Sequence, residues 1–197
     1  MKIHQLTLAL AAATLFSGAA MAQTAVETDT QRDVNQQQRI EQGLKSGQLS
    51  TKEAGQLERE QHHVDKMEAH DMKSGAISPA EQQRLNAAQN RVSQDIAKDK
   101  HNGTVGDPNS ISSKRMQADV QRNVNQEKRI ENGEKSGALT TREAGQLENG
   151  QAKIDRREAR AAGNGHISAK EQAQIQRGEN HQSRKIARKK HSAKKAG

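Results

Sequence analysis

The sequence predicts an all-α fold made of two tandem copies of a three-helix unit, with tight helix-turn-helix connections. Residues 31–102 align with 121–192 at a constant shift of 90, and 20 of 28 positions are identical between 31–58 and 121–148. Both copies are rich in the helix formers Gln, Glu, Lys, Arg and Ala and lack the alternation typical of strands. A motif of Gly, any residue, Leu or Ile, Ser or Thr, two residues and Glu recurs four times.

Each position of this motif fits the end of one helix and the start of the next. Glycine adopts the left-handed backbone that commonly ends a helix, and a Ser or Thr followed by Glu three residues later forms a capping box. We therefore assign helix ends to Gly47, Gly75, Gly137 and Gly165, N-caps to Ser50, Ser78, Thr140 and Ser168, and box-closing acids to Glu53, Glu81, Glu143 and Glu171.

The four turns divide each copy into three helices. In the first copy we expect helices over about 31–45, 51–73 and 79–100, the last starting with Pro79 at its first position. In the second copy the corresponding ranges are 121–135, 141–162 and 169–190. Gly55 and Gly145 interrupt the middle helices, where glycine costs about 1 kcal/mol unless another helix packs closely against it.

The ends of the chain and a polar stretch between the copies set the domain limits. Lys2, the apolar run 6–16 and the Ala20-Met21-Ala22 site are typical of a signal peptide cleaved after Ala22, so we expect a periplasmic or secreted protein. The predicted segments are a signal peptide (1–22), a flexible N-terminus (23–30), repeat 1 (31–102), a linker (103–118), repeat 2 (119–192) and a basic tail end (193–197).

Composition excludes several functions. The chain has no Cys, Trp or Tyr, its one Phe lies in the predicted signal, and its mean hydropathy is -1.09. With so few apolar side chains a thick core and a deep apolar pocket are not expected, so we predict helices packed in an extended rather than compact arrangement, or association into a homodimer. No catalytic motif is present, so we predict that the protein is not an enzyme.

Two metal sites are open to consideration, although no cofactor is required by the sequence. His63, Met67 and His70 fall on one helix face, and His with Met suits copper. The turns also resemble the second half of an EF-hand loop, which implies calcium binding, with Gly165, Ile167 and Glu171 aligned. Calcium needs several carboxylate oxygens, and at the first, third and fifth loop positions of the four turns the one carboxylate is Glu134.

The C-terminus is strongly basic. The last 14 residues hold seven positive charges and no acid: Arg184, Lys185, Arg188, Lys189, Lys190, Lys194 and Lys195. Such a run can bind anionic surface polymers, or it can simply keep the chain in solution. Specific nucleic-acid binding is not expected because no aromatic side chain is available for stacking, and no segment of the mature chain is long and apolar enough to cross a membrane.

Two family resemblances follow from these motifs. Residues 49–58 and 139–148 (LSTKEAGQLE and LTTREAGQLE) resemble the helix-start motif of Spy-type periplasmic chaperones, which implies binding of unfolded or envelope proteins. The whole repeat, which ends in Ser-x-x-Ile-x-x-x-Lys-His, resembles uncharacterised exported helical-repeat proteins of proteobacteria. The expected function is therefore a non-enzymatic, exported binding or stress-protective protein of the cell envelope, with metal binding and adhesion to anionic surfaces as alternatives.

Overall fold

The protein is an all-α bundle, which confirms the predicted fold class. The computed structural model describes residues 17–192, with side chains for 29–192. This part holds no strand and consists of α1 (Ser17–Ser46), α2 (Thr51–Asp71), the 3-10 turn η1 (Met72–Ser74), α3 (Pro79–Asp99), α4 (Ile111–Lys135), α5 (Thr141–Ala161), the 3-10 turn η2 (Ala162–Asn164) and α6 (Ala169–Ser192).

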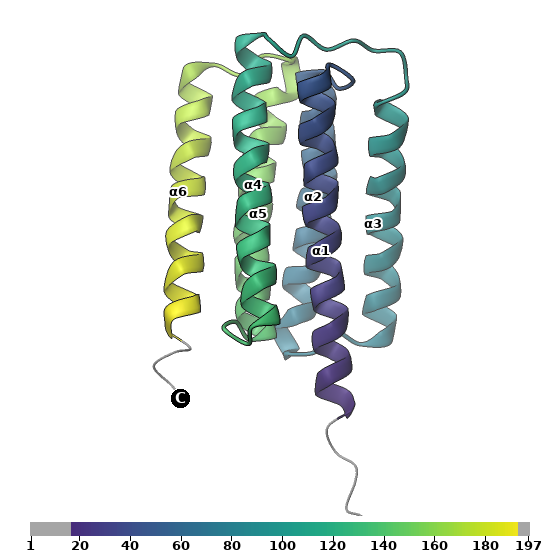
Figure 1. Cartoon of the computed structure of the whole chain (residues 1–197), viewed down its shortest axis with the longest axis vertical. Helices are drawn as coiled ribbons and strands as arrows, with labels where there is room; N and C mark the ends of the chain where they lie inside the picture. The colour runs from purple at the N-terminus through teal and green to yellow at the C-terminus, as the bar shows by residue number, and fades with distance from the viewer. Residues whose placement is uncertain (1–16, 193–197) are drawn as a thin grey trace, which may run out of the picture.

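The two copies pack against each other along their whole length (Figure 1). α1 lies against α4 and α2 lies against α5, so the central four-helix bundle takes two helices from each copy. α3 covers α1 and α2 on one side, and α6 covers α4 and α5 on the other. The copies therefore do not form the extended array expected from composition, because the thin apolar stripe of each copy is covered by its duplicate.

The four turns have the geometry that their sequence motif requires. Gly47, Gly75, Gly137 and Gly165 have positive φ values of 75°, 90°, 68° and 81°. Ser50, Ser78 and Thr140 each form a capping box with the Glu three residues later. Ser168 forms the same pair of bonds with Glu171. These local interactions fix where α2, α3, α5 and α6 begin.

The first helix of each copy is longer than expected. α4 begins at Ile111, inside the segment 103–118 that the sequence assigned to the linker, because the Ser110 side chain accepts a bond from the Ser113 amide and Met116 is fully buried. α1 likewise spans 23–30, which we expected to be flexible. Residues 1–16 and 193–197, with most of the predicted signal and the tail end, lie outside the described residues.

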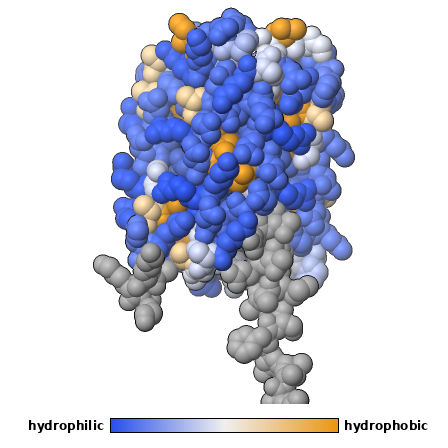
Figure 2. All heavy atoms as spheres, in the orientation of Figure 1, coloured by the Kyte–Doolittle hydropathy of each residue, from blue (hydrophilic) through white to orange (hydrophobic). Residues whose placement is uncertain are grey.

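Apolar side chains form a narrow core between the helices, and the outside is polar. The core includes Ile40, Leu57, Ile130 and Leu147, each fully buried. Figure 2 shows a largely hydrophilic face with scattered apolar spots. In the part of the chain that the structure describes, no helix is long and apolar enough to span a membrane.

Two helix glycines allow the copies to approach closely. A Cβ added at Gly55 of α2 would lie 2.5 Å from the Cβ of Ala162 in η2. At the equivalent Gly145 of α5 it would lie 2.6 Å from the Cβ of Met72 in η1. Both neighbours belong to the other copy, and both distances are too short for real carbon contacts. Glycine at these positions is therefore a packing requirement between copies.

We expect Gly145→Ala to destabilise the protein, because the new methyl group must displace Met72. Overpacking costs about 1–3 kcal/mol, against a gain of about 1 kcal/mol from the better helix propensity of alanine. Thermal unfolding of Gly145→Ala should show a lower midpoint. Gly163→Ala is the matched control, since a Cβ there meets nothing within 4 Å; equal midpoints for the two variants would contradict the close approach.

Candidate metal centre

The centre of the bundle is acidic. α2 contributes Glu58, Asp65 and Glu68, and α5 contributes their duplicates Glu148, Asp155 and Glu158. Asp33 from α1 and Glu127 from α4 complete the set. No one of these eight residues is more than 3% exposed. Charged residues are almost never buried to this degree unless they are paired.

Helical spacing places these acids in the core. Glu58, Asp65 and Glu68 lie at relative positions 0, 7 and 10 of α2, so they share a face with the buried Gln61. This face adjoins the apolar stripe that contains Leu57 and Val64. Since α2 and α5 form the most extensive helix pair of the molecule, the acidic faces of the two duplicates meet each other.

The carboxylates form two clusters, which we name by their size. In the five-carboxylate cluster, one oxygen from each of Asp33, Asp65 and Glu68 lies within 4.8 Å of the others, and so do oxygens of Asp65, Glu127 and Glu148. Asp65 therefore belongs to both triads. The three-carboxylate cluster consists of Glu58, Asp155 and Glu158, whose oxygens satisfy the same distance. Charge repulsion from Asp155 acts on Asp65, which places the clusters next to each other.

Many of the carboxylate oxygens have no hydrogen-bond donor among the described residues. Both oxygens of Glu148 and both of Asp155 are buried without one. The same holds for one oxygen each of Asp33, Glu58, Asp65, Glu68, Glu127 and Glu158. Within residues 29–192, no Lys, Arg or His nitrogen lies within 4.0 Å of any of the eight carboxylates. If all eight acids were ionised, the described protein groups would therefore leave most of their charge uncompensated.

Amide side chains surround the clusters. Gln89 of α3 donates to both Asp33 (3.1 Å) and Glu68 (3.2 Å). Gln37 donates to Glu58 (2.9 Å), and Asn123 donates to Glu158 (2.8 Å). These bonds hold one oxygen of each acid in a fixed direction. An amide donor that orients a carboxylate in this way is the usual outer support of a metal ligand.

At two positions one copy has a carboxylate where the other has an amide, so the two clusters differ in their number of acids. Asp33 of the first copy corresponds to Asn123 of the second, whereas Gln37 corresponds to Glu127. Both acids fall in the five-carboxylate cluster and both amides fall beside the three-carboxylate cluster. The two copies therefore have the same order of helices but differ in the charge that they place in the core.

Burial makes these acids hard to ionise. It raises the pKa of Asp33 from 3.8 to about 7 and the pKa of Glu58 from 4.5 to about 7. Burial, followed by repulsion from neighbouring carboxylates, raises the pKa values of Asp65, Glu68, Glu148 and Glu158 well above their ordinary values. The pKa values of Glu127 and Asp155 rise in the same way. Near neutral pH the clusters must therefore hold protons or cations.

The geometry of both clusters fits a hard divalent cation. Oxygen ligands lie 2.3–2.6 Å from Ca²⁺, so two oxygens on one ion are at most about 5 Å apart. The triads meet this limit, because their ligand oxygens all lie within 4.8 Å of one another. The oxygens without donors are available as ligands, and the cation would supply the missing positive charge. No nitrogen or sulfur ligand belongs to these clusters, which favours Ca²⁺, Mg²⁺ or Mn²⁺ over copper and zinc.

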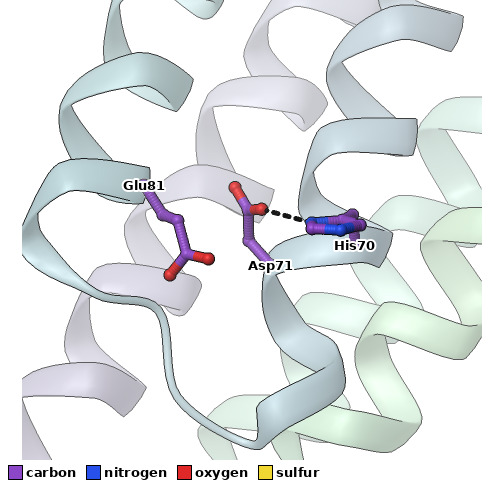
Figure 3. A group of neighbouring side chains, drawn as sticks. All are labelled: His70, Asp71 and Glu81. Atoms are coloured by element: carbon purple, nitrogen blue, oxygen red, sulfur yellow. Dashed lines mark hydrogen bonds and ion pairs between the residues drawn. The ribbon is translucent and has the colours of Figure 1, made fainter.

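The predicted copper patch lies on the surface, away from this core. His63 and His70 are exposed, and Met67 is partly buried against the apolar core. His70 instead neighbours Asp71 and Glu81 (Figure 3), with its Nδ1 3.0 Å from Asp71 Oδ1. Glu81 is already engaged by Ser78, which donates to it through both its amide and its hydroxyl. Copper binding at His63, Met67 and His70 stays a prediction.

The turns that resemble EF-hand loops use their acids for capping. Glu171, the last ligand position of the aligned loop, accepts bonds from the Ser168 amide (2.8 Å) and hydroxyl (2.7 Å). The same contacts occur at Glu53, Glu81 and Glu143. Each of these acids therefore has one oxygen committed to the helix start, which reduces what a cation could use at the turn.

Most of the basic residues predicted to bind anionic surfaces belong to α6. Arg184 and Arg188 are exposed. Lys185 donates to the carbonyl of Gln146, and Lys190 donates to that of Arg129 (3.0 Å). Lys189 lies 3.8 Å from Glu143. Lys194 and Lys195 fall outside the described residues. Some basic side chains of α6 thus bind groups of α4 and α5 and hold the helix against the bundle.

Sequence analysis did not identify the eight acids of the two clusters, although a signal was present. The pattern Glu-x-x-Gln-x-x-x-Asp-x-x-Glu occurs at 58–68 and again at 148–158, unchanged in all four positions.

Comparison of the chain with protein-family models, with curated proteins and with solved structures finds no match. The chemistry of the site therefore has to be inferred from its geometry.

Raised carboxyl pKa values predict an unusual dependence of stability on pH. Because folded-state values exceed the unfolded ones, the folded chain binds more protons between about pH 4 and pH 7, so stability is greatest in acid and falls as pH rises. With a chelator present, we expect the free energy of unfolding to drop by more than about 3 kcal/mol across this range, since each pKa unit is worth about 1.4 kcal/mol.

Excess Ca²⁺ should reverse this trend, because cations bind the deprotonated carboxylates and compete with protons. Urea unfolding at several pH values, with chelator or with Ca²⁺, measures both slopes. A chelated protein whose stability rises with pH would show that the carboxylates are compensated by protein groups.

Proposed function

We propose that the protein is a non-enzymatic, exported metal-binding protein that holds hard divalent cations in its buried carboxylate clusters, with Ca²⁺ as the preferred ion. One observation carries this proposal: eight carboxylates from four helices are buried together with donor-free oxygens, and no base of residues 29–192 lies within 4.0 Å of them. An ionised carboxylate in an apolar interior is too costly to remain uncompensated. A divalent cation supplies both the charge and the missing contacts.

The preference for Ca²⁺ follows from the ligands and their enclosure. Ca²⁺ takes six to eight oxygens in adaptable geometry, whereas Mg²⁺ requires near-ideal octahedra and usually keeps several waters. The two clusters are enclosed by protein and supply carboxylates from helices α1, α2, α4 and α5. An enclosed site with many carboxylates and little space for water suits Ca²⁺ better than Mg²⁺. Mn²⁺, which shares the preference for oxygen, is the closest competitor.

Charge sets the capacity of each cluster. Five ionised carboxylates exceed the charge of one divalent cation, so the five-carboxylate cluster accommodates two ions, with Asp65 shared between its two triads. The three-carboxylate cluster accommodates one ion, with Gln37 and Asn123 holding its acids in place. The proposed capacity is therefore up to three cations per chain, filled first where the negative charge is greatest.

The other functions suggested by the sequence have less structural support. Binding of unfolded clients needs apolar surface, and in the described residues the exposed large apolar side chains are Val105 and Ile111 alone. Copper binding would use side chains that are exposed at His63 and His70 and packed at Met67. Export rests on the signal-like segment 1–22 and is part of this proposal.

The double variant Asp65→Asn/Asp155→Asn tests the proposal. We expect Ca²⁺ affinity, measured by calorimetric titration of the chelator-stripped protein, to fall at least about a hundredfold, because central charged ligands are lost. In the metal-free state the variant should be more stable than wild type at about pH 8, since two buried charges are removed. A structural role alone would not produce opposite effects on affinity and stability.

His63→Gln/His70→Gln is the matched control, since it removes two potential metal ligands from the surface of the same helix. It should leave Ca²⁺ affinity unchanged within about twofold. A wild-type protein that binds neither Ca²⁺ nor Mn²⁺ would contradict the proposed function. So would a loss of affinity that is equal in the two double variants.

A further inference from the structure

A groove on the second copy is lined by basic side chains. It lies between α5 and α6 and has a volume of about 610 Å³. Its walls carry Lys153, Arg157, Arg160, Arg177, His181 and Lys185. The one acid in the lining is Glu171, which is bound to Ser168 in the helix cap. The groove thus has the size of a small-molecule site and a strong positive charge.

The bases in the groove are not neutralised by the protein. In residues 29–192, no acid lies within 4.0 Å of Lys153, Arg157, Arg160 or Arg177. Burial, followed by repulsion from Lys189, Lys153 and Arg188, lowers the pKa of Lys185. Like charges gathered in one concavity without counter-charges repel each other, and an anion would relieve that repulsion.

Two glycines open this groove. Gly178 of α6 faces the guanidinium of Arg157, and a Cβ at that position would overlap it. Gly150 of α5 lies against the side-chain amide of Gln182, which a Cβ would also displace. Both glycines line the groove. A side chain at either position would push a polar group out of its present place.

The first copy has no such charge at the equivalent positions. There the residues that correspond to Lys153, Arg157, Arg160, Arg177, His181 and Lys185 are His63, Met67, His70, Ala87, Arg91 and Asp95. Arg91 lies 3.9 Å from Asp95, and Met67 and Ala88 pack against the core. The basic groove is therefore a feature of one copy, which a general requirement for solubility would not produce.

We infer that this groove binds a sugar or polyol that carries clustered phosphate groups. Arginine forms paired hydrogen bonds to phosphate oxygens, and Arg157, Arg160 and Arg177 line one cavity. Gln174 and Gln182 add amides suited to hydroxyl groups. No Phe, Tyr or Trp lines the groove to stack a nucleobase, which favours a ligand without a base. The phosphates belong either to a free sugar phosphate or to a phosphorylated lipid headgroup.

The double variant Arg157→Met/Arg160→His, which introduces the first-copy residues, tests this site in the full chain. Fructose bisphosphate is the free probe, and phosphatidylcholine vesicles with or without phosphatidylinositol bisphosphate are the lipid probe. We expect the affinity for the probe that binds to fall about a hundredfold, at roughly tenfold for each arginine lost. Gly178→Ala, which displaces Arg157 without changing charge, should weaken binding by about tenfold.

Arg156→Gln/Arg184→Gln is the control, because it removes the same charge from exposed positions of α5 and α6 outside the groove. It should change affinity by less than about threefold. Binding of fructose bisphosphate identifies a free ligand, and binding to the phosphatidylinositol bisphosphate vesicles alone identifies a headgroup. An equal loss in both double variants, or no binding of either probe by wild type, would overturn the inference.

Discussion

Burying ionised carboxylates is the constraint on which the rest of this structure depends. Transfer of an ion from water to an apolar interior costs far more than a small bundle gains from its core. The eight core acids lie where α2 meets α5 and α1 meets α4, so the same contacts that join the copies also enclose the charge. Whatever compensates that charge, protons or cations, therefore decides whether the bundle is stable.

Duplication explains how so polar a chain can form a bundle. Each copy alone would expose its narrow apolar stripe and its acidic face, but together they cover both. Gly55 and Gly145 allow the close approach by receiving Ala162 and Met72 of the other copy. The two halves differ in charge: the differences at positions 33/123 and 37/127 concentrate acids in one cluster, and six basic residues of α5 and α6 line a groove in the second half.

Local features of the fold could be predicted from sequence, whereas the site could not. Helix starts at Thr51, Pro79, Thr141 and Ala169 follow from capping boxes, which act over four residues. The start of α4 was missed because Ser110 has Ser113, not Glu, three residues on. Acids such as Asp65 and Asp155 were not among the predicted site residues, because buried charges are rare and their pattern alone does not indicate burial. Their burial depends on packing between segments 90 residues apart, which helical periodicity alone does not reveal.

Anomalous scattering from crystals of the full chain grown with Mn²⁺ tests the central claim most directly. Mn²⁺ shares the oxygen preference of Ca²⁺ and gives a strong anomalous signal. The carboxylate clusters predict peaks inside the bundle, one or two among Asp33, Asp65, Glu68, Glu127 and Glu148, and one beside Asp155. Peaks confined to the surface near His63 and His70, or a bundle whose core acids bond only to one another, would contradict the proposed metal centre.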